Sequence, residues 1–420
     1  MTLATLGSRG DVQPMVVLGT ELRRRGHEIV FAVPPNLLEF VRRAGFAARP
    51  VGPDSQAFVE SADGQRWLAS GNARAFLKAM GEVGHEIAPQ ADAELLEACK
   101  GAEAIVCGIL GEDHALCVAE AQGVPLVTLH LAPARSTGRY PNYLVTTRSI
   151  PSRLVNRATA VLVERIIWRT LRADTNVLRS QLGLAPVTTT TPSRMARMGI
   201  TELQGYSRLL VPGLDDYGLN RPFTGFLTPD PELRGWLGES RVDPSLDAWL
   251  SAGEPPVYFG FGSMPVADPA SMLAMIGRVS GRLGFRALVS AGWSGMHAGR
   301  EDNERLRVTG ELNHDLVLPR CRLAVHHGGA GTVASSVMAG IPSFVCSVFA
   351  DQLFWGARLA ELGCGVHVRF PALDEHSLET GLRQLLGPEV DRRSVALGAQ
   401  LRSEVATAAR AADLVEESCG

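Results

Sequence analysis

The clearest candidate for chemistry in the sequence is a glycine-rich run, VHHGGAGT, at positions 325–332. An apolar strand that passes into glycines and then into a helix directs free backbone N–H groups and the positive end of the helix at one point, which favours phosphate. Glycine lets the backbone approach the anion closely, while His326 and Thr332 add side-chain donors. We predict an anion site here; a tight turn with two satisfied histidines is the alternative.

The same run also fits a dinucleotide-binding fingerprint in its alanine variant, through Gly329, Gly331 and Ala334. Asp351 follows Gly331 by about 20 residues, where that fingerprint places a ribose-binding acid. A nicotinamide-dependent oxidoreductase is therefore an alternative, although the paired histidines count against it. We expect no metal site, because neighbouring residues on a strand point to opposite faces and no third ligand is spaced nearby.

A second loop, GSRGD at positions 7–11, follows the first apolar run of the chain. Ligands of open α/β sheets bind at the carboxyl ends of the strands, which is where this loop is expected. Asp11, beside Arg9 and the start of a helix, should be ionised at neutral pH and able to accept a proton from a hydroxyl. The plainer interpretation is that Asp11 only caps the helix.

Both loops lie within an alternation of apolar runs and amphipathic segments, which predicts two α/β domains, each a parallel sheet covered by helices, with a cleft between them. The expected strands span 3–6, 28–33, 104–109, 125–131, 209–211, 257–261, 287–290, 322–326 and 343–348. The expected helices span 15–25 (with Pro14 in its first turn), 37–44, 152–182, 270–283 and 331–339. Residues 212–256 are rich in Pro, Gly and Asp and are expected to form a linker with short helices.

The composition is that of a globular protein of two or three domains. The 420 residues include 41 basic and 44 acidic side chains, and this balance gives no support to a nucleic-acid partner. Seven cysteines without a Cys-x-x-Cys pair are expected to be buried reduced thiols, which fits the cytoplasm. We expect neither a signal peptide nor a membrane-spanning helix. Because the first apolar run begins at once, a few further residues are expected upstream.

The expected helix at 152–182 is strongly basic. Between Arg148 and Arg179 there are seven arginines and only two acids, Glu164 and Asp174. One interpretation is a surface helix with a solvated basic face. The other is docking on an anionic membrane or on a lipid-like acceptor.

Four stretches together resemble the nucleotide-sugar-dependent glycosyltransferases of family 1. They are GSRGDVQP at 7–14, FGSM at 261–264, NHDLVLPR at 313–320, and the run from 326 to 365 that includes ADQ at 350–352. The likeness is to the bacterial branch that contains glycopeptide-antibiotic and mycobacterial glycopeptidolipid glycosyltransferases, and to sterol glucosyltransferases. It implies the α/β GT-B fold, in which two Rossmann-like parallel-sheet domains face each other across a cleft.

The resemblance implies a domain plan and roles for individual residues. The implied parts are an acceptor domain at 1–211, a linker at 212–256, a nucleotide-sugar domain at 257–395, and a C-terminal helix in 396–420 that packs back on the first domain. Asp11 is the implied general base for the acceptor hydroxyl. The implied ligands of the donor diphosphate are Ser8, Ser263, His326, Ala330, Gly331 and Thr332. Asp351 and Gln352 would bind the donor sugar, and Leu312 and Asn313 would border the nucleobase.

The implied reaction is an inverting, metal-independent transfer of a sugar from a UDP- or dTDP-sugar to a hydroxyl of a lipophilic acceptor. That acceptor would be a secondary metabolite, a glycolipid or a sterol-like molecule. The nucleotide-sugar is a co-substrate, and no cofactor is implied. We expect the protein in the cytoplasm, and contact of 152–182 with a membrane stays one of the two interpretations of that helix. The alternatives that stay open are the oxidoreductase, a non-catalytic nucleotide-sugar-binding relative, and a sugar-nucleotide epimerase of the same fold.

Overall fold

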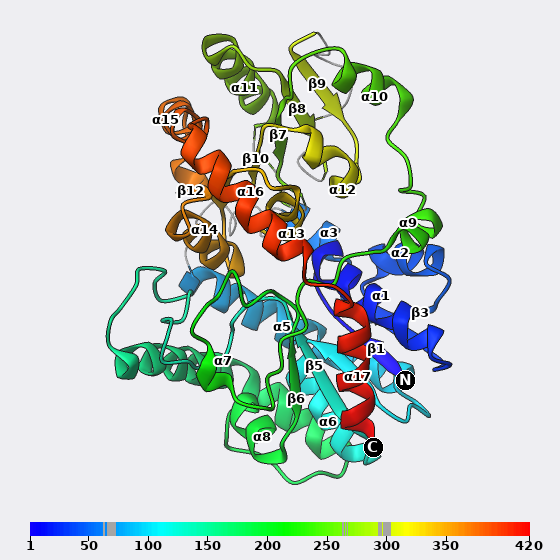
Figure 1. Ribbon diagram of the computed structural model, residues 1–420. Helices are drawn as coiled ribbons and strands as arrows, with labels where there is room; N and C mark the ends of the chain where they lie inside the picture. The colour runs from blue at the N-terminus through cyan, green and yellow to red at the C-terminus, as the bar shows by residue number, and fades with distance from the viewer. Residues whose placement is uncertain are drawn as a thin grey trace. The chain divides into compact units, whose positions relative to one another are not determined.

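The structure is a computed structural model, and it describes residues 1–61, 64, 73–262, 264, 266, 268–292, 296 and 304–420. It contains two compact units, each built on its own sheet (Figure 1). The first unit comprises Met1–Phe58, Ala73–Leu237 and Ala406–Gly420, and the second comprises Val59–Asn72 and Gly238–Val405. The segment expected as a linker, 212–256, is divided between the two units after Leu237.

The first unit has six parallel strands in the order β3-β2-β1-β4-β5-β6. Their bounds are β1 (Thr2–Ala4), β2 (Val30–Val33), β3 (Ala47–Pro50), β4 (Ile105–Gly108), β5 (Leu126–His130) and β6 (Thr201–Gln204). The predicted strands at 3–6, 28–33, 104–109 and 125–131 are confirmed to within two residues at each end. The predicted strand at 209–211 is wrong, because Leu210 and Val211 are buried in a turn and the last strand is β6.

Helices surround this sheet and include the long α5 and α7 (Figure 1). The helices that begin in the first unit are α1 (Arg9–Arg24), α2 (Leu38–Arg43), α3 (Ser55–Glu60), α5 (Ala73–Ala98), α6 (Glu112–Gln122), α7 (Arg153–Gln181), α8 (Thr191–Met198), α9 (Pro231–Trp236) and α17 (Thr407–Cys419), with 3-10 turns at Pro35–Leu37 and Asp215–Tyr217. The helix predicted at 152–182 is confirmed as α7.

Helix α1 begins earlier than predicted. The sequence places Pro14 in the first turn, whereas Ser8 is the N-cap and Pro14 lies inside the helix. The apolar residues of α1 recur at helical spacing and are buried against the sheet, with Val12 and Leu22 fully enclosed. The C-terminal helix α17 packs on α1, where Arg25 donates to carboxylates of α17.

The second unit repeats the design, with six parallel strands in the order β12-β11-β10-β7-β8-β9. They are β7 (Val257–Gly260), β8 (Ala287–Ser290), β9 (Leu306–Thr309), β10 (Leu323–His326), β11 (Ser343–Ser347) and β12 (Gly365–Arg369). Its helices are α10 (Pro244–Ser251), α11 (Pro269–Leu283), α12 (His314–Val317), α13 (Ala330–Ala339), α14 (Asp351–Glu361), α15 (Glu375–Leu385) and α16 (Pro388–Arg402), with 3-10 turns at Leu318–Arg320 and Phe370–Ala372. The sequence predicted four of these strands, but not β9 and β12.

The two sheets share a strand order that determines where ligands can bind. In the first unit β1 lies beside β4, and in the second β7 lies beside β10. At this pair the strand order of each parallel sheet reverses, because the chain adds later strands on the other side. Open α/β sheets bind ligands outside the carboxyl ends of the strands at such a reversal. The loop at 7–11 follows β1, and the loops that begin at Phe261 and His327 follow β7 and β10.

All seven cysteines are free thiols, as predicted; six are buried and Cys419 is partly so. Burial raises the pKa of the Cys99 thiol to about 11 and that of Cys321 to about 12, so both stay protonated and unreactive at neutral pH. In the described part of the chain, no helix combines the length and the apolar character needed to cross a bilayer.

Candidate functional site

The glycine-rich run of the second unit joins β10 to α13. β10 ends at His326, Gly328 turns the chain with φ +93°, and α13 begins at Ala330. The N-cap residue Gly329 offers no side chain to the first turn of this ten-residue helix. The first N–H groups of α13 therefore lack a helical partner, and Gly331 among them is exposed. These donors and the helix dipole make the predicted anion-binding geometry.

His326 adds a buried donor beside this helix start. Its side chain is fully buried, and Nδ1 accepts a hydrogen bond from the backbone N–H of Gly328 at 3.1 Å. This bond places the proton of a neutral ring on Nε2, which has no hydrogen-bond partner among the described residues. Burial, followed by the repulsion that protonated His327 and His314 would exert on a protonated ring, lowers the pKa of His326 to about 3. The ring is thus a neutral N–H donor at physiological pH.

His327 has a supporting position that the sequence did not reveal. Its ring fills the space beside two glycines: a Cβ added to Gly262 would lie 2.7 Å from Cε1, and a Cβ added to Gly329 would lie 2.5 Å from Nε2. His327 therefore packs the loop after β7 against the loop after β10. Burial lowers its pKa to about 4, so it is neutral as well. Ser263, the other predicted diphosphate ligand of this unit, lies outside the described residues.

Gln352 braces the turn that leads into α14. Its Oε1 accepts hydrogen bonds from the backbone N–H groups of Val348 at 2.9 Å and Phe349 at 3.3 Å, and its Nε2 lies 3.6 Å from Sδ of Met264. The side chain is buried. Gln352 thus shapes the loop before Asp351, which is the first residue of α14 and is partly exposed.

The start of α14 lies against the glycine-rich loop. A Cβ added to Gly328 would lie 3.1 Å from the carbonyl oxygen of Gln352 and 2.6 Å from Cγ1 of Val345. The residue between the turn and the helix, Ala350, has φ +52°, a conformation that costs a non-glycine residue free energy. The structure therefore brings Asp351 and Gln352 close to the loop of His326, and their roles in binding the donor stay predictions.

The side chain of Asn313 is occupied by hydrogen bonds to the surrounding backbone. It is the N-cap of α12, where its Oδ1 accepts from the N–H of Asp315 at 2.9 Å and its Nδ2 donates to the carbonyl of Glu239 at 2.8 Å. Leu312 is partly buried against the small apolar core around α10. Any contact of this loop with a nucleobase would therefore come from its backbone or from Leu312.

Asp11 belongs to a capping box at the start of α1. Its Oδ2 accepts from the backbone N–H of Ser8 at 2.8 Å and lies 3.3 Å from the Ser8 hydroxyl, which in turn accepts from the N–H of Gly10. Gly7, with φ +109°, leaves room for the carboxylate. Asp11 therefore does cap the helix. A side chain in this position can also act as a base, so the two interpretations of Asp11 are compatible.

The environment of Asp11 tunes its acidity. Burial raises the pKa of the carboxyl to about 6, against the lowering effect of the hydrogen bonds from Ser8. At pH 7 most molecules still carry the carboxylate, as predicted. The sequence suggests Arg9 and the helix start as the reason, whereas hydrogen bonds from Ser8 are what lower the pKa against the effect of burial. The guanidinium of Arg9 donates to Oε1 of Gln13 at 3.1 Å and lies over the ring of Phe40.

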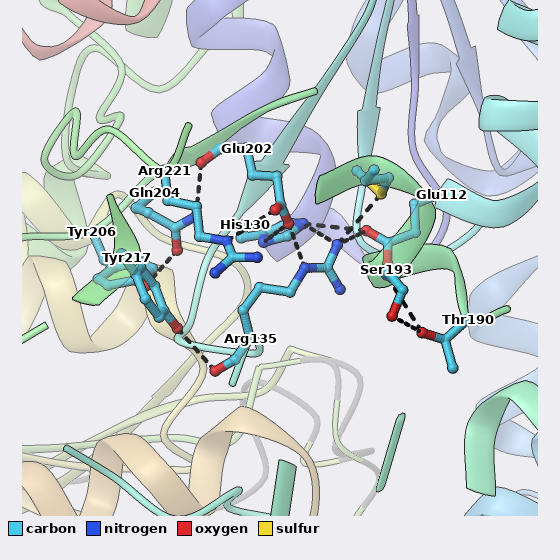
Figure 2. Close-up of polar contacts among 11 residues, drawn as sticks. Glu112, His130, Arg135, Thr190, Ser193, Glu202, Gln204, Tyr206, Tyr217 and Arg221 are labelled. Carbon is cyan, nitrogen blue, oxygen red and sulfur yellow. Dashed lines mark hydrogen bonds and ion pairs between the residues drawn. The ribbon is translucent and has the colours of Figure 1, made fainter. Parts of the chain in front are cut away.

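A second polar cluster of the first unit, absent from the sequence predictions, surrounds Arg135. Figure 2 shows the Arg135 guanidinium between Glu112, His130 and Glu202, which come from α6, β5 and β6. Nη2 of Arg135 lies 2.6 Å from Glu112, and Nε donates to Glu202, which also pairs with Arg221 at 2.9 Å. Burial alone would raise the pKa of Glu112, but the charge of Arg135 and the contact with His130 hold it at about 2.

This cluster holds together segments that are distant in the sequence. Tyr206 donates to Oε1 of Gln204 at 2.6 Å, and Tyr217 donates to the carbonyl of Arg135 at 3.3 Å (Figure 2). The loop after β5 is thereby fixed to the carboxyl ends of β5 and β6. We assign the cluster a structural role in shaping that edge of the sheet, along which the loop of Asp11 also lies.

Two family models match the chain. The glycosyltransferase family 28 N-terminal domain matches residues 1–140. The erythromycin biosynthesis protein CIII-like C-terminal domain matches residues 302–419.

The chain is also similar to whole proteins. An uncharacterised glycosyltransferase of Mycobacterium leprae is 36% identical over 420 residues, which cover 99% of this chain and 96% of that protein. A sterol 3-beta-glucosyltransferase of Arabidopsis thaliana is 30% identical, over 97% of this chain and 66% of that protein.

Solved structures show the same architecture. The glycosyltransferase of kitacinnamycin has a TM-score of 0.72 at 18% identity, over 100% of this chain and 98% of that one. The glycosyltransferase VinC, solved with dTDP, has a TM-score of 0.66 at 17% identity, over 100% and 99%. The fold is therefore GT-B, and the oxidoreductase interpretation of the glycine-rich loop is wrong. The chain belongs to the family of glycosyltransferases that includes the mycobacterial proteins and the sterol 3-beta-glucosyltransferases.

Proposed function

We propose that this glycosyltransferase transfers a sugar from a UDP- or dTDP-sugar to a hydroxyl of a lipophilic acceptor, with inversion at the anomeric carbon. The observation that carries the donor assignment is the buried Nε2–H of His326, which has no partner among the described residues and lies beside the uncapped start of α13. Solved relatives of the fold in complex with thymidine diphosphate support the same ligand class.

The second unit would stabilise the departing diphosphate. As the bond between the anomeric carbon and the diphosphate oxygen breaks, negative charge grows on the phosphate oxygens. The N–H groups of Ala330, Gly331 and Thr332, the helix dipole and His326 would stabilise that charge without any need for a metal ion. Ser8 and Ser263 are proposed as further donors to the same oxygens.

The first unit would supply the base. In the proposed step, Asp11 takes the proton of the acceptor hydroxyl, whose oxygen attacks the anomeric carbon from the side opposite the diphosphate. A new carbon–oxygen bond forms, and the electrons of the broken bond leave with the nucleoside diphosphate. A base with a pKa of about 6 suits this step near neutral pH, because it is ionised yet still accepts a proton readily.

The remaining donor contacts follow from the loops already described. Asp351, partly exposed at the start of α14, is proposed to bind hydroxyls of the donor sugar. Gln352 is proposed to act at the same place, but its Oε1 is occupied by the backbone, so only its remaining amide hydrogens would be available. The loop at Leu312 and Asn313 is proposed to border the nucleobase.

We infer that the acceptor is lipophilic and that the reaction takes place in the cytoplasm, at or near a membrane surface. Two observations support the lipophilic acceptor and the membrane surface. A family member 30% identical to this chain is named for a sterol substrate. In addition, the first unit exposes apolar side chains on α7, within the stretch 152–182 for which membrane docking is one of the two interpretations of the sequence.

A thermal-shift experiment with UDP, dTDP, NAD and NADP tests the proposed donor class. A ligand that binds only the folded state raises the melting temperature by mass action. We expect stabilisation by UDP or dTDP and none by NAD or NADP. Stabilisation by a dinucleotide alone would refute the proposal.

A further inference from the structure

Helix α7 exposes an unusual concentration of large apolar side chains. Leu154 is 77% exposed and Leu162 54% exposed. The other exposed large apolar side chains on this helix are Val155, Val161, Ile166 and Val177. An apolar surface of this kind on a folded protein marks a contact with another surface.

Arginines continue the same strip along the helix. At 100° per residue, Leu154, Val161 and Leu162 fall within an arc of about 100° that also contains Arg165, Arg169 and Arg172. All three arginines are exposed, and none has an ion-pair partner among the residues that the structure describes. We call these six residues the α7 face.

The acids of α7 point elsewhere. Asp174 lies 2.6 Å from Nδ1 of His85. Glu164 is partly buried and interacts electrostatically with Arg135 and Arg221 of the cluster in Figure 2. The α7 face therefore carries positive charge without a compensating carboxylate on the helix.

Other residues of α7, next to the α7 face, opposite it and beyond its last turn, fix the helix to the first unit. Trp168 is buried and donates from Nε1 to the carbonyl of Thr188 at 3.1 Å. Leu178 is buried, and Arg179 pairs with Glu120 of α6. Helix α7 also packs along α5 and α6 (Figure 1). The α7 face thus lies on a helix that contacts with α5, α6 and the loop at Thr188 hold to the first unit.

We propose that the α7 face docks this glycosyltransferase on an anionic membrane surface. The apolar side chains of the first turns would enter the boundary between headgroups and acyl chains, and the arginines that follow would meet acidic headgroups. The charge argues for anionic lipid over a neutral apolar partner, because an unpaired arginine strip gains nothing from the latter. The inference rests on the membrane location proposed above and deepens it by naming the surface that binds; because it requires no sugar transfer, vesicle binding tests it separately from the reaction.

The test is flotation of the full chain with vesicles of phosphatidylcholine alone and of phosphatidylcholine mixed with phosphatidylglycerol. We expect binding to the mixed vesicles, weak binding to the neutral ones, and release by added salt. Arg165→Gln, Arg169→Gln and Arg172→Gln should each weaken binding about fivefold. Leu154→Glu with Leu162→Glu should abolish it.

The matched control is Val395→Glu, because Val395 is 53% exposed on α16 of the second unit. It should bind mixed vesicles like the unaltered protein. Each variant should keep its thermal shift with dTDP, which separates loss of docking from loss of fold or donor binding. Failure of the unaltered protein to float, or equal flotation of the double Leu154→Glu, Leu162→Glu variant, would overturn the proposal. A dimer in solution that this double variant dissociates, without vesicle binding, would assign the face to a second copy instead.

Discussion

The backbone N–H of Gly328 donates to Nδ1 of His326 at 3.1 Å, and this one bond determines which nitrogen of the ring can serve a ligand. With Nδ1 engaged, Nε2 carries the proton of a ring that burial keeps neutral. The contact also closes the turn that leads into α13. His326 therefore has two separable tasks, shaping the loop and donating to the diphosphate.

His326→Asn should separate these tasks. The asparagine Oδ1 can replace Nδ1 as the acceptor for Gly328, but no donor reaches the position of Nε2. We expect dTDP affinity to fall about ten- to a hundredfold in calorimetry, the loss expected for a hydrogen bond to a charged group. The fall in the melting temperature should be smaller than that of His326→Ala. Unchanged affinity would remove His326 from the diphosphate site.

The pH dependence of dTDP binding gives a related check. Because burial lowers the pKa of His326 to about 3, its ring has no charge to gain or lose between pH 5 and pH 8. The unaltered protein and His326→Asn should therefore show parallel affinity profiles over that range, once the titration of the ligand is subtracted. A step near pH 6.5 that disappears in the variant would contradict the neutral donor.

Gly329→Ala tests the packing of the two loops around His327. The new Cβ would lie 2.5 Å from Nε2 of His327, so the ring or the loop must move. We expect the free energy of unfolding to fall by about 1 to 3 kcal/mol, the usual cost of overpacking. Gly331→Ala is the matched control, because no atom of the described residues lies within 4 Å of its Cβ position. Its stability should stay the same or rise by up to about 1 kcal/mol. Equal losses in chemical denaturation would refute this packing.

Ala350→Gly should stabilise the protein. Ala350 has φ +52° at the start of α14, where glycine pays no steric cost. We expect a net gain of about 1 kcal/mol in the free energy of unfolding. This figure is the strain relieved in the folded state less the stability lost because glycine gives the unfolded chain more conformational entropy. Ala396→Gly, at an exposed position within α16, should instead lose about 0.5 to 1 kcal/mol. A loss of stability in Ala350→Gly would show that the turn is not strained.

Arg135→Met should destabilise the first unit strongly, because it leaves the buried carboxylates of Glu112 and Glu202 without their shared partner. We expect a loss of about 3 to 5 kcal/mol at pH 7. Since the pKa of folded Glu112 is lowered to about 2, its stabilisation is present above pH 4.5 and is lost as the pH falls towards 2. The fall in the free energy of unfolding between pH 4.5 and pH 2 should therefore be smaller in Arg135→Met than in the unaltered protein. Arg157→Met, which breaks an exposed pair with Asp216, should cost at most about 1 kcal/mol.

The sequence predicted the strands that are mostly apolar, and it missed β3, β6, β9 and β12, each of which contains a charged residue. Strand β6 contains Glu202 and Gln204, which are buried only because Arg135 and Tyr206 satisfy them. The local sequence has no pattern that predicts such a strand. The buried Leu210 and Val211 follow β6 in a turn. Because they form a short apolar run, the sequence predicted the last strand of this unit there instead of at β6.

The candidate sites divide in the same way. The glycine-rich loop and the Ser8–Asp11 pair are local, so their spacing in the sequence is enough to predict an anion site and a capped helix. The support of His327 for Gly262 depends on the pairing of β7 with β10, and the bracing by Gln352 depends on a turn that the sequence did not specify. Such contacts arise only when the sheet is assembled.

The pH profile of turnover tests the assigned base. Since the pKa of Asp11 is raised to about 6, the ionised form that accepts the proton is lost as the pH falls through that value. With a nucleotide-sugar donor and a panel of lipophilic alcohols, kcat/KM should fall about tenfold per pH unit below pH 6. A profile that stays flat down to pH 4.5 would exclude a base with this pKa.

The most direct measurement is the turnover of Asp11→Asn at pH 7.5, together with its dTDP affinity. The amide oxygen can still accept from Ser8, so the cap is kept while the base is lost. Asp54→Asn is the matched control, because Asp54 also accepts backbone N–H bonds at a helix start of the first unit. We predict that Asp11→Asn loses turnover at least about a hundredfold with dTDP affinity unchanged, and that Asp54→Asn keeps both. Full turnover in Asp11→Asn would contradict the proposed mechanism.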